Sequence, residues 1–111
     1  MTIQYSDFEK VDIRVGKIIK VEDTEGLRIS AYKMTIDFDE EVGTKVSIGQ
    51  YTKNYSKDDL MSRLVMGVVN FEPKQIGNYL SETLTLGFED SDGNVVLATP
   101  EKPVPIGSKM Y

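Results

Sequence analysis

Short runs in which apolar and polar residues alternate, separated by turn-forming residues, restrict the fold of this chain more than any other feature. The clearest run covers residues 32–38, with Tyr32, Met34, Ile36 and Phe38 at every second position. Because successive side chains of a β-strand point to opposite faces of the sheet, this run predicts a strand with one buried face.

Two neighbouring runs show the same pattern. The first has its apolar residues on one parity, at Val11, Ile13, Val15, Ile19 and Val21. Gly16 interrupts this run and predicts a bend or bulge in a curved strand. The second run, residues 45–50, is predicted to place Val46 and Ile48 inside and Lys45, Ser47 and Gly49 outside.

The hydrophobic period then changes over one short segment. Ser56 is a typical N-cap residue, and Asp59 stands where a capping box carries its acidic side chain. Leu60, Met61 and Leu64 follow at helical spacing, which predicts one short helix.

Strand patterns return in the last part of the chain. Residues 64–71 and 83–88 predict two strands, and an Asp92-Gly93 turn precedes a further run at residues 95–99. The prolines of the tail rule out a central strand, so we expect the tail to lie extended against another part of the protein.

Three strands, one short helix and two or three further strands form the element order of an OB-fold. We therefore expect an all-β protein with one short helix, folded as a five-stranded Greek-key barrel in a single domain of residues 1–111. A β-sandwich is the alternative, and the helix after the third strand favours the barrel.

The composition removes several classes of function. The chain has no cysteine and no histidine, which excludes disulfides, thiol chemistry and the commonest metal ligand. It has no Gly-rich phosphate loop, and the acidic residues 37–41 are interpreted as a solvated turn. We expect a non-catalytic protein with no metal and no cofactor.

The net charge of -5 argues against coating DNA or anionic membranes by bulk charge. No apolar run reaches the ~20 residues of a membrane span, and the N-terminal segment lacks the features of a signal peptide. We therefore expect a soluble, cytoplasmic protein that binds neither DNA nor membranes.

Positive charge is nevertheless concentrated in residues 43–57, which have a local balance of +3 from Lys45, Lys53 and Lys57 and contain no acid. Tyr51 and Tyr55 are interleaved with these lysines. Aromatic platforms beside phosphate-binding lysines are the means by which OB-folds hold nucleic acid. The alternative is that both tyrosines pack in the core.

Two other places offer polar contacts. Lys33 and Lys45 are predicted to face outward on adjacent strands, where their charges add. A proline turn after residues 64–71 presents Asn70, Lys74 and Gln75, side chains that suit contacts to phosphates or unpaired bases. An ordinary loop with polar caps is the alternative.

A set of segments in a fixed order spans nearly the whole chain: Asp7-Phe8, Val11-Asp12-Ile13-Arg14-Val15-Gly16, Ile36-Asp37-Phe38, Ser47-Ile48-Gly49-Gln50, Thr52-Lys53, Tyr55, Asn70-Phe71, Pro73-Lys74-Gln75-Ile76, Ser81-Glu82, Leu86-Gly87, Val104-Pro105 and Gly107. With them the chain resembles the tRNA-binding domain family, the OB-fold modules appended to some methionyl-, phenylalanyl- and tyrosyl-tRNA synthetases. Within that family it is most similar to the free-standing CsaA-type proteins, proposed as export-related chaperones.

The resemblance implies an OB-fold, a non-catalytic tRNA-binding role and a homodimer joined through segments near both chain ends. The RNA contacts that it implies are Lys33, Lys45, Ser47, Asn70, Lys74, Gln75 and Ser81, and the basic segment adds Lys53 as a candidate.

The chain departs from the family pattern at three places. Lys74 stands where the family often has arginine, which keeps the charge but loses bidentate phosphate contacts. Residues 23–27 lack the loop of the synthetase-appended domains, which favours the CsaA-type branch. Ile48 stands where that branch commonly has serine.

Three functional hypotheses follow. The leading one is tRNA binding that selects for structure rather than base sequence. The alternative is a CsaA-type export-related chaperone for unfolded or precursor polypeptides, with Tyr51, Phe71, Ile76 and Tyr79 as candidate contacts. The third is an assembly adaptor that binds another protein only.

Overall fold

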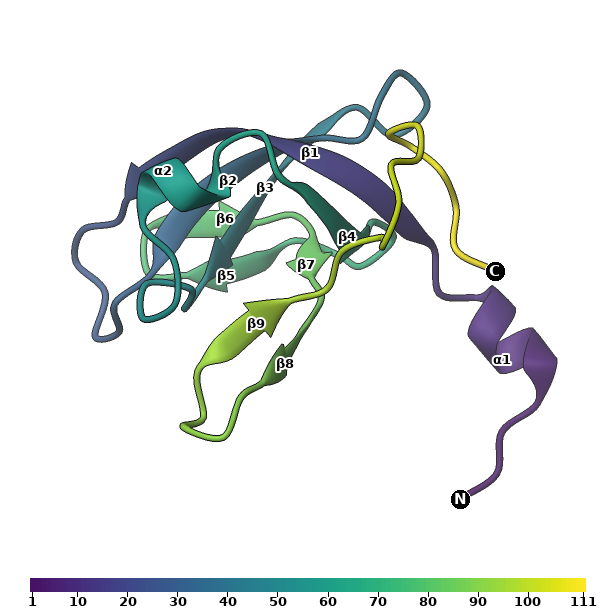
Figure 1. Ribbon diagram of the computed structural model, residues 1–111. Coiled ribbons are helices and arrows are strands. Elements are labelled where there is room, and N and C mark those ends of the chain that lie inside the picture. Colours follow the sequence, from purple (N-terminus) through teal and green to yellow (C-terminus); the bar gives the residue numbers. More distant parts are fainter.

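The structure is a computed structural model that describes residues 1–111. Its elements, in chain order, are α1 (Tyr5–Glu9), β1 (Ile13–Asp23), β2 (Tyr32–Asp37), β3 (Thr44–Gly49), α2 (Lys57–Leu60), β4 (Leu64–Val68), β5 (Lys74–Ile76), β6 (Tyr79–Ser81), β7 (Leu84–Thr85), β8 (Gly87–Glu89) and β9 (Val95–Leu97). Figure 1 shows a curved sheet that wraps into a barrel, with α1 projecting away from it near the C-terminus. Neither helix has the length or the apolar character needed to cross a lipid bilayer.

The barrel is built around the long strand β1. This strand pairs antiparallel with β2 through residues 17–23 and with β4 through residues 13–17. β2 also pairs with β3, and β4 with β7, which gives a five-stranded sheet in the order β3-β2-β1-β4-β7. The predicted class, a mostly β protein with a nearly closed OB-like barrel, is confirmed.

The alternation predicted for β2 is also confirmed. Tyr32, Met34, Ile36 and Phe38 are all buried, and they form the centre of the core with Ile18, Tyr51, Leu60, Val65 and Val69. A strand with one buried face is therefore what the sequence pattern indicated.

The single parity predicted for β1 is wrong. The register of β1 against β2 shifts between Ile18 and Lys20, so an extra residue is accommodated at Ile19. Ile18 is consequently fully buried, whereas Ile19 is 45% exposed. Gly16 is not the bulge: a Cβ atom there would lie 2.5 Å from the Ile36 side chain, so this glycine lets β1 pack closely on the core.

The outer strand β3 meets the end of β6 and the β6–β7 connection across an edge that we call the β3–β7 seam, made by Val46, Ile48, Ser81, Glu82 and Thr83. The N–H groups of Glu82 and Thr83 donate to the Val46 carbonyl at 2.7 and 3.2 Å. The Glu82 carboxylate accepts from the Val46 N–H at 3.0 Å, and Ser81 Oγ accepts from the Ile48 N–H at 3.1 Å. Side chains thus satisfy two backbone N–H groups of β3 that would otherwise be left unpaired at the edge of the sheet.

The short helix α2 forms as predicted. Ser56 Oγ accepts from the Asp59 N–H at 3.1 Å, and the Asp59 carboxylate accepts from the Ser56 N–H at 2.9 Å. This reciprocal capping box satisfies two backbone donors, and Leu60 closes the helix by inserting into the core.

Other parts of the chain differ from the prediction in detail. The run at residues 83–88 is divided into β7 and β8, and β8 pairs with β9 through a turn in which Gly93 has a φ of 79°. The helix α1 and the β5–β6 hairpin were not predicted. The tail lies extended as expected, and the Val15 N–H donates to the Ser108 carbonyl at 3.0 Å.

Candidate nucleic-acid interface

A groove lined by residues of β3 lies between the β5–β6 and β8–β9 hairpins. Figure 1 shows where these two hairpins lie relative to the barrel. It consists of two adjoining cavities of about 510 and 620 Å3. Ile48, Lys74, Ile76 and Leu84 line both cavities, so the cavities form one continuous surface, which we call the β3 groove.

Lys33 and Lys45 lie on opposite faces of the sheet, contrary to the prediction that their charges add on one face. Lys33 is the cross-strand partner of Ile48, whereas Lys45 is the partner of the buried Ile36. Cross-strand partners share a face, and Lys45 is an odd number of residues from Ile48. Lys33 reaches the hairpin beside the groove, with its Nζ 6.0 Å from the centre of the Tyr79 ring.

The four predicted RNA-binding lysines carry uncompensated charges. Lys33, Lys45, Lys53 and Lys74 take part in none of the ion pairs of the structure. Lys57 differs, because its Nζ lies 2.7 Å from the Asp23 carboxylate, and this hydrogen bond raises the pKa of the lysine. The basic segment of residues 43–57 therefore offers two free cations rather than three.

Ser47 and Tyr51 are buried rather than exposed. Ser47, the cross-strand partner of Met34, points into the barrel, where its Oγ accepts from Thr85 Oγ1 at 2.8 Å. Tyr51 is 6% exposed and belongs to the core, as the alternative interpretation proposed. Burial raises the pKa of Tyr51, and the Ser47 and Thr85 hydroxyls oppose that shift. Neither side chain is accessible to a ligand in this structure.

Asn70 and Ser81 are engaged in the fold. The Asn70 side chain accepts from the Asp12 N–H and donates to the Lys10 carbonyl, at 3.0 and 2.7 Å. Ser81 Oγ belongs to the β3–β7 seam. The hydrogen-bonding groups that suggested RNA contacts at these two positions already have partners within the chain.

The β5–β6 hairpin carries the remaining predicted contacts. Lys74 and Gln75 are exposed on β5, although Gln75 Nε2 also donates to the Gly77 carbonyl at 2.7 Å. Tyr79 is half-buried, and its hydroxyl accepts from the Glu25 N–H at 3.0 Å. Ile76 is also half-buried and lines the groove.

Exposed aromatic rings lie at both ends of the β3 groove. Phe71, a predicted polypeptide contact, is 55% exposed at one end, and Phe88 is 72% exposed at the other. Phe88 was not predicted as a site residue, because the alternation of residues 83–88 suggested an ordinary strand. The break between β7 and β8 at Leu86 places Phe88 beside the groove.

Arg28 is a second residue that the sequence analysis missed. It is exposed in the loop between β1 and β2 and takes part in no ion pair. The loop is packed on the hairpin, since the Leu27 side chain occupies the space next to Gly77. Local charge counting overlooked Arg28 because Asp23 and Glu25 precede it in the sequence.

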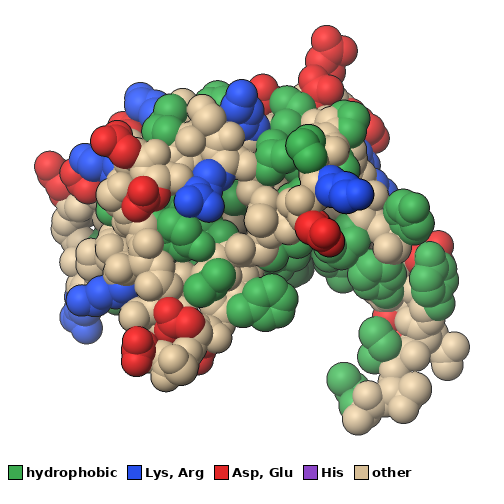
Figure 2. All heavy atoms as spheres, in the orientation of Figure 1, with side chains coloured by type: hydrophobic (Ala, Val, Ile, Leu, Met, Phe, Trp, Pro, Cys, Tyr) green, Lys and Arg blue, Asp and Glu red, His purple; other side chains and the backbone are tan.

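Basic and acidic side chains are interspersed over the face shown in Figure 2, with apolar groups between them. No group of three or more carboxylates is arranged to hold a metal ion. The lining of the β3 groove accordingly combines the cation Lys74 with apolar side chains and the carboxylates of Glu72, Glu82 and Glu89.

Known proteins match this chain both in sequence and in structure. Residues 13–109 match the family described as "Putative tRNA binding domain". The chain is 35% identical over 108 residues to a methionine–tRNA ligase of Thermococcus onnurineus and 36% identical over 110 residues to that of Pyrococcus abyssi. These matches cover 97% and 99% of the chain but 14% and 15% of the two ligases, so the chain spans a small part of these relatives.

Three solved structures match along all or nearly all of their length. A CsaA chaperone protein from Picrophilus torridus is 45% identical, with a TM-score of 0.92 over 99% of this chain and 100% of that one. The chaperone CsaA from Bacillus anthracis is 36% identical, with a TM-score of 0.93 over 100% of both chains. A MetRS-related protein from Pyrococcus horikoshii is 22% identical and shares the fold, with a TM-score of 0.87 over 100% of this chain and 99% of that one.

Proposed function

Because this chain belongs to the tRNA-binding domain family, we propose that it is a non-catalytic tRNA-binding protein that acts as a homodimer and selects RNA structure rather than base sequence. The observation that carries the proposal is the family match over residues 13–109. The geometry around the β3 groove supports it, because free cations there would contact phosphates, which carry no base-sequence information.

The candidate contacts form two groups. Lys33, Lys74 and Gln75 lie on or beside the β5–β6 hairpin, and Arg28 lies in the loop packed against it. Lys45 and Lys53 are the free cations of the neighbouring basic segment. Ser47, Asn70 and Ser81 do not belong to either group, because the first is buried and the other two are hydrogen-bonded within the fold.

A tRNA titration at several salt concentrations tests this function. The logarithm of the association constant falls linearly with the logarithm of the salt concentration. Each phosphate contact that is lost should make this slope less steep by about 0.7–0.9. Lys74→Glu and Lys33→Glu should therefore weaken binding and flatten the salt dependence. Lys102→Glu, an equal charge change at an exposed position of the tail, is the matched control.

The proposal fails if intact wild-type protein shows no salt-dependent binding to tRNA. Equal losses for Lys74→Glu and Lys102→Glu would instead indicate a general effect of net charge. Binding that survives changes in tRNA sequence, and is lost when the RNA is unfolded, is the expected sign of structural selectivity.

The homodimer is supported by the two chain ends. The helix α1 buries none of its residues, and Tyr5 is 68% exposed. A hollow of about 340 Å3 between α1 and the tail is lined by Phe8, Val11 and Met110, together with Glu9 and Lys109. An apolar centre with one acid and one base is self-complementary across a two-fold axis. Light scattering should therefore give twice the mass of the chain.

Polypeptide binding is the second candidate function. The similarity to proteins named CsaA chaperones and the apolar lining of the β3 groove favour it, since Phe71, Leu84 and Phe88 are each more than half exposed. Exposed apolar surface of this kind marks binding sites in soluble proteins. Phe71→Ser with Phe88→Ser should abolish protection of an unfolded client from aggregation, while Lys74→Glu should leave it unchanged.

A further inference from the structure

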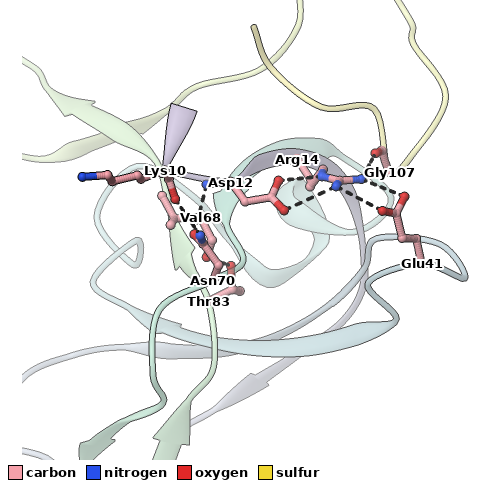
Figure 3. Close-up of polar contacts among 8 residues, drawn as sticks. All are labelled: Lys10, Asp12, Arg14, Glu41, Val68, Asn70, Thr83 and Gly107. Atoms are coloured by element: carbon pink, nitrogen blue, oxygen red, sulfur yellow. Dashed lines mark hydrogen bonds and ion pairs between the residues drawn. The ribbon is translucent and has the colours of Figure 1, made fainter. Parts of the chain in front are cut away.

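Asn70 lies where the last residues of β4 meet the connection between α1 and β1 (Figure 3). Its amide bonds to the Lys10 carbonyl and the Asp12 N–H, and the neighbouring Val69 N–H donates to the Asp12 carbonyl at 2.9 Å. These bonds attach the N-terminal arm, residues 1–12, to the barrel. Because α1 buries no residue, its direction depends on this attachment.

Arg14 connects the same point to the C-terminal tail. Its Nε and Nη2 donate to the Asp12 carboxylate at 2.6 and 3.3 Å, and its Nη1 donates to both Glu41 Oε2 and the Gly107 carbonyl at 3.1 Å. The hydrogen bonds to Asp12 and then Glu41 raise the pKa of Arg14, so the guanidinium stays charged. A bidentate pair of this kind fixes orientation as well as charge.

Asp12 therefore joins two sets of contacts. Its backbone is held by Asn70 and Val69, and its carboxylate is held by Arg14, which also holds the tail at Gly107. Figure 3 shows these side chains converging from β1, the end of β4, the β2–β3 loop and the tail. The network thus sets the position of both segments that line the hollow between α1 and the tail.

We propose that Asp12, Arg14 and Asn70 form a terminal clamp that presets the arm and the tail for docking a second copy of this chain. The clamp residues are positioning residues and not RNA contacts. This inference rests on the proposed homodimer, whose docking surface is the self-complementary hollow. A preset arm and tail lose less conformational freedom when the two copies associate, which strengthens association.

The test compares Asn70→Ala with Asn78→Ala. Asn78 is an exposed asparagine in the turn between β5 and β6, and its side chain makes no hydrogen bond within the chain. Sedimentation should show that Asn70→Ala weakens dimerisation roughly 5- to 100-fold, as expected for the loss of two hydrogen bonds. Asn78→Ala should dimerise like the wild type. NMR of the Asn70→Ala monomer should show a more mobile Phe8, with core amides exchanging as in the wild type.

Arg14→Lys is the second variant. It keeps the positive charge but loses the planar guanidinium group, whose N–H donors bond to Asp12, Glu41 and Gly107 together. It should also weaken dimerisation and increase the mobility of the tail. If Asn70→Ala does not fold, the result for Arg14→Lys decides the question.

Two outcomes would overturn the clamp while leaving the homodimer intact. The first is unchanged dimerisation in both variants. The second is a loss of tRNA affinity in Asn70→Ala at concentrations where the protein is fully dimeric, which would make Asn70 an RNA contact. A wild-type protein that stays monomeric at its highest soluble concentration would refute the homodimer itself, and the clamp with it.

Discussion

Gly16 shows how much of this fold depends on the absence of one side chain. A Cβ at this position would meet Ile36 at 2.5 Å and the Phe38 ring at 2.7 Å, and both neighbours are fully buried. Gly16→Ala should therefore lower the free energy of unfolding by about 1–3 kcal/mol through overpacking. Chemical denaturation measures this loss, and Lys17→Ala, at the adjacent exposed position, should change stability far less.

Tyr51 should make the free energy of unfolding depend on pH in the alkaline range. Burial raises the pKa of its hydroxyl, so the native state holds this proton more tightly than the unfolded chain does. Its stabilising effect is complete below about pH 10, the ordinary tyrosine value, and is lost as the pH rises through the raised pKa. Denaturation curves between neutral and alkaline pH should show this decline.

Tyr51→Phe provides the control for that measurement, because phenylalanine keeps the ring and cannot ionise. The alkaline decline should become shallower in this variant. An identical decline would show that groups other than Tyr51 cause the effect.

Single residues also explain why some side chains have partners that the sequence did not indicate. Alternation with Val46 and Ile48 predicts that Ser47 faces outward, but Ser47 is buried and its hydrogen-bond partner Thr85 comes 38 positions later in the chain. Asn70 bonds to backbone groups 58 and 60 positions away. Local spacing carries no information about such distant partners, so the sequence could indicate that these residues matter without showing what they contact.

At the scale of elements, β2 and α2 were predictable, whereas the irregular parts and the orientation of β3 were not, since Ser47 pairs with the buried Met34 and points into the barrel. The burial of β2 and the capping box of α2 follow from local pattern, and both were predicted correctly. In β1, the register shift at Ile19 reverses the parity of the residues beyond it, and a bulge leaves no reliable trace in the sequence. The three-residue strands β5 and β6 are too short to show a period.

The β3–β7 seam can be tested as an element. Ser81→Ala combined with Glu82→Ala removes the acceptors of the Ile48 and Val46 N–H groups. Hydrogen exchange at these two amides should accelerate, and stability should fall by about 1 kcal/mol or more. The Met34 amide, within the β2 strand, serves as the internal reference, and equal acceleration there would indicate global rather than local opening.

At the scale of the whole molecule, pairing of two copies should determine affinity for RNA. Two linked sets of weak contacts can bind roughly 100-fold or more tighter than one set, through effective concentration. Phe8→Glu places a charge in the hollow between α1 and the tail, so it should yield monomers with correspondingly weaker tRNA binding. Phe8 lies outside the core cluster, so thermal stability of the monomer should change little.

Ile19→Glu is the matched control for this experiment, since it makes the same change from apolar to acidic at an exposed position of β1. It should leave both mass and RNA affinity close to those of the wild type. Monomeric Phe8→Glu protein with undiminished affinity would show that one copy suffices for binding.

The β3–β7 seam also affects the tendency of the protein to aggregate at high concentration. An uncovered strand edge is a template on which chains stack into fibrils, and β3 would offer such an edge beside an apolar groove. Ser81 and Glu82 occupy the donors that a neighbouring strand would need. The fold can thus expose apolar surface to binding partners while the backbone of β3 is protected from pairing with strands of further copies.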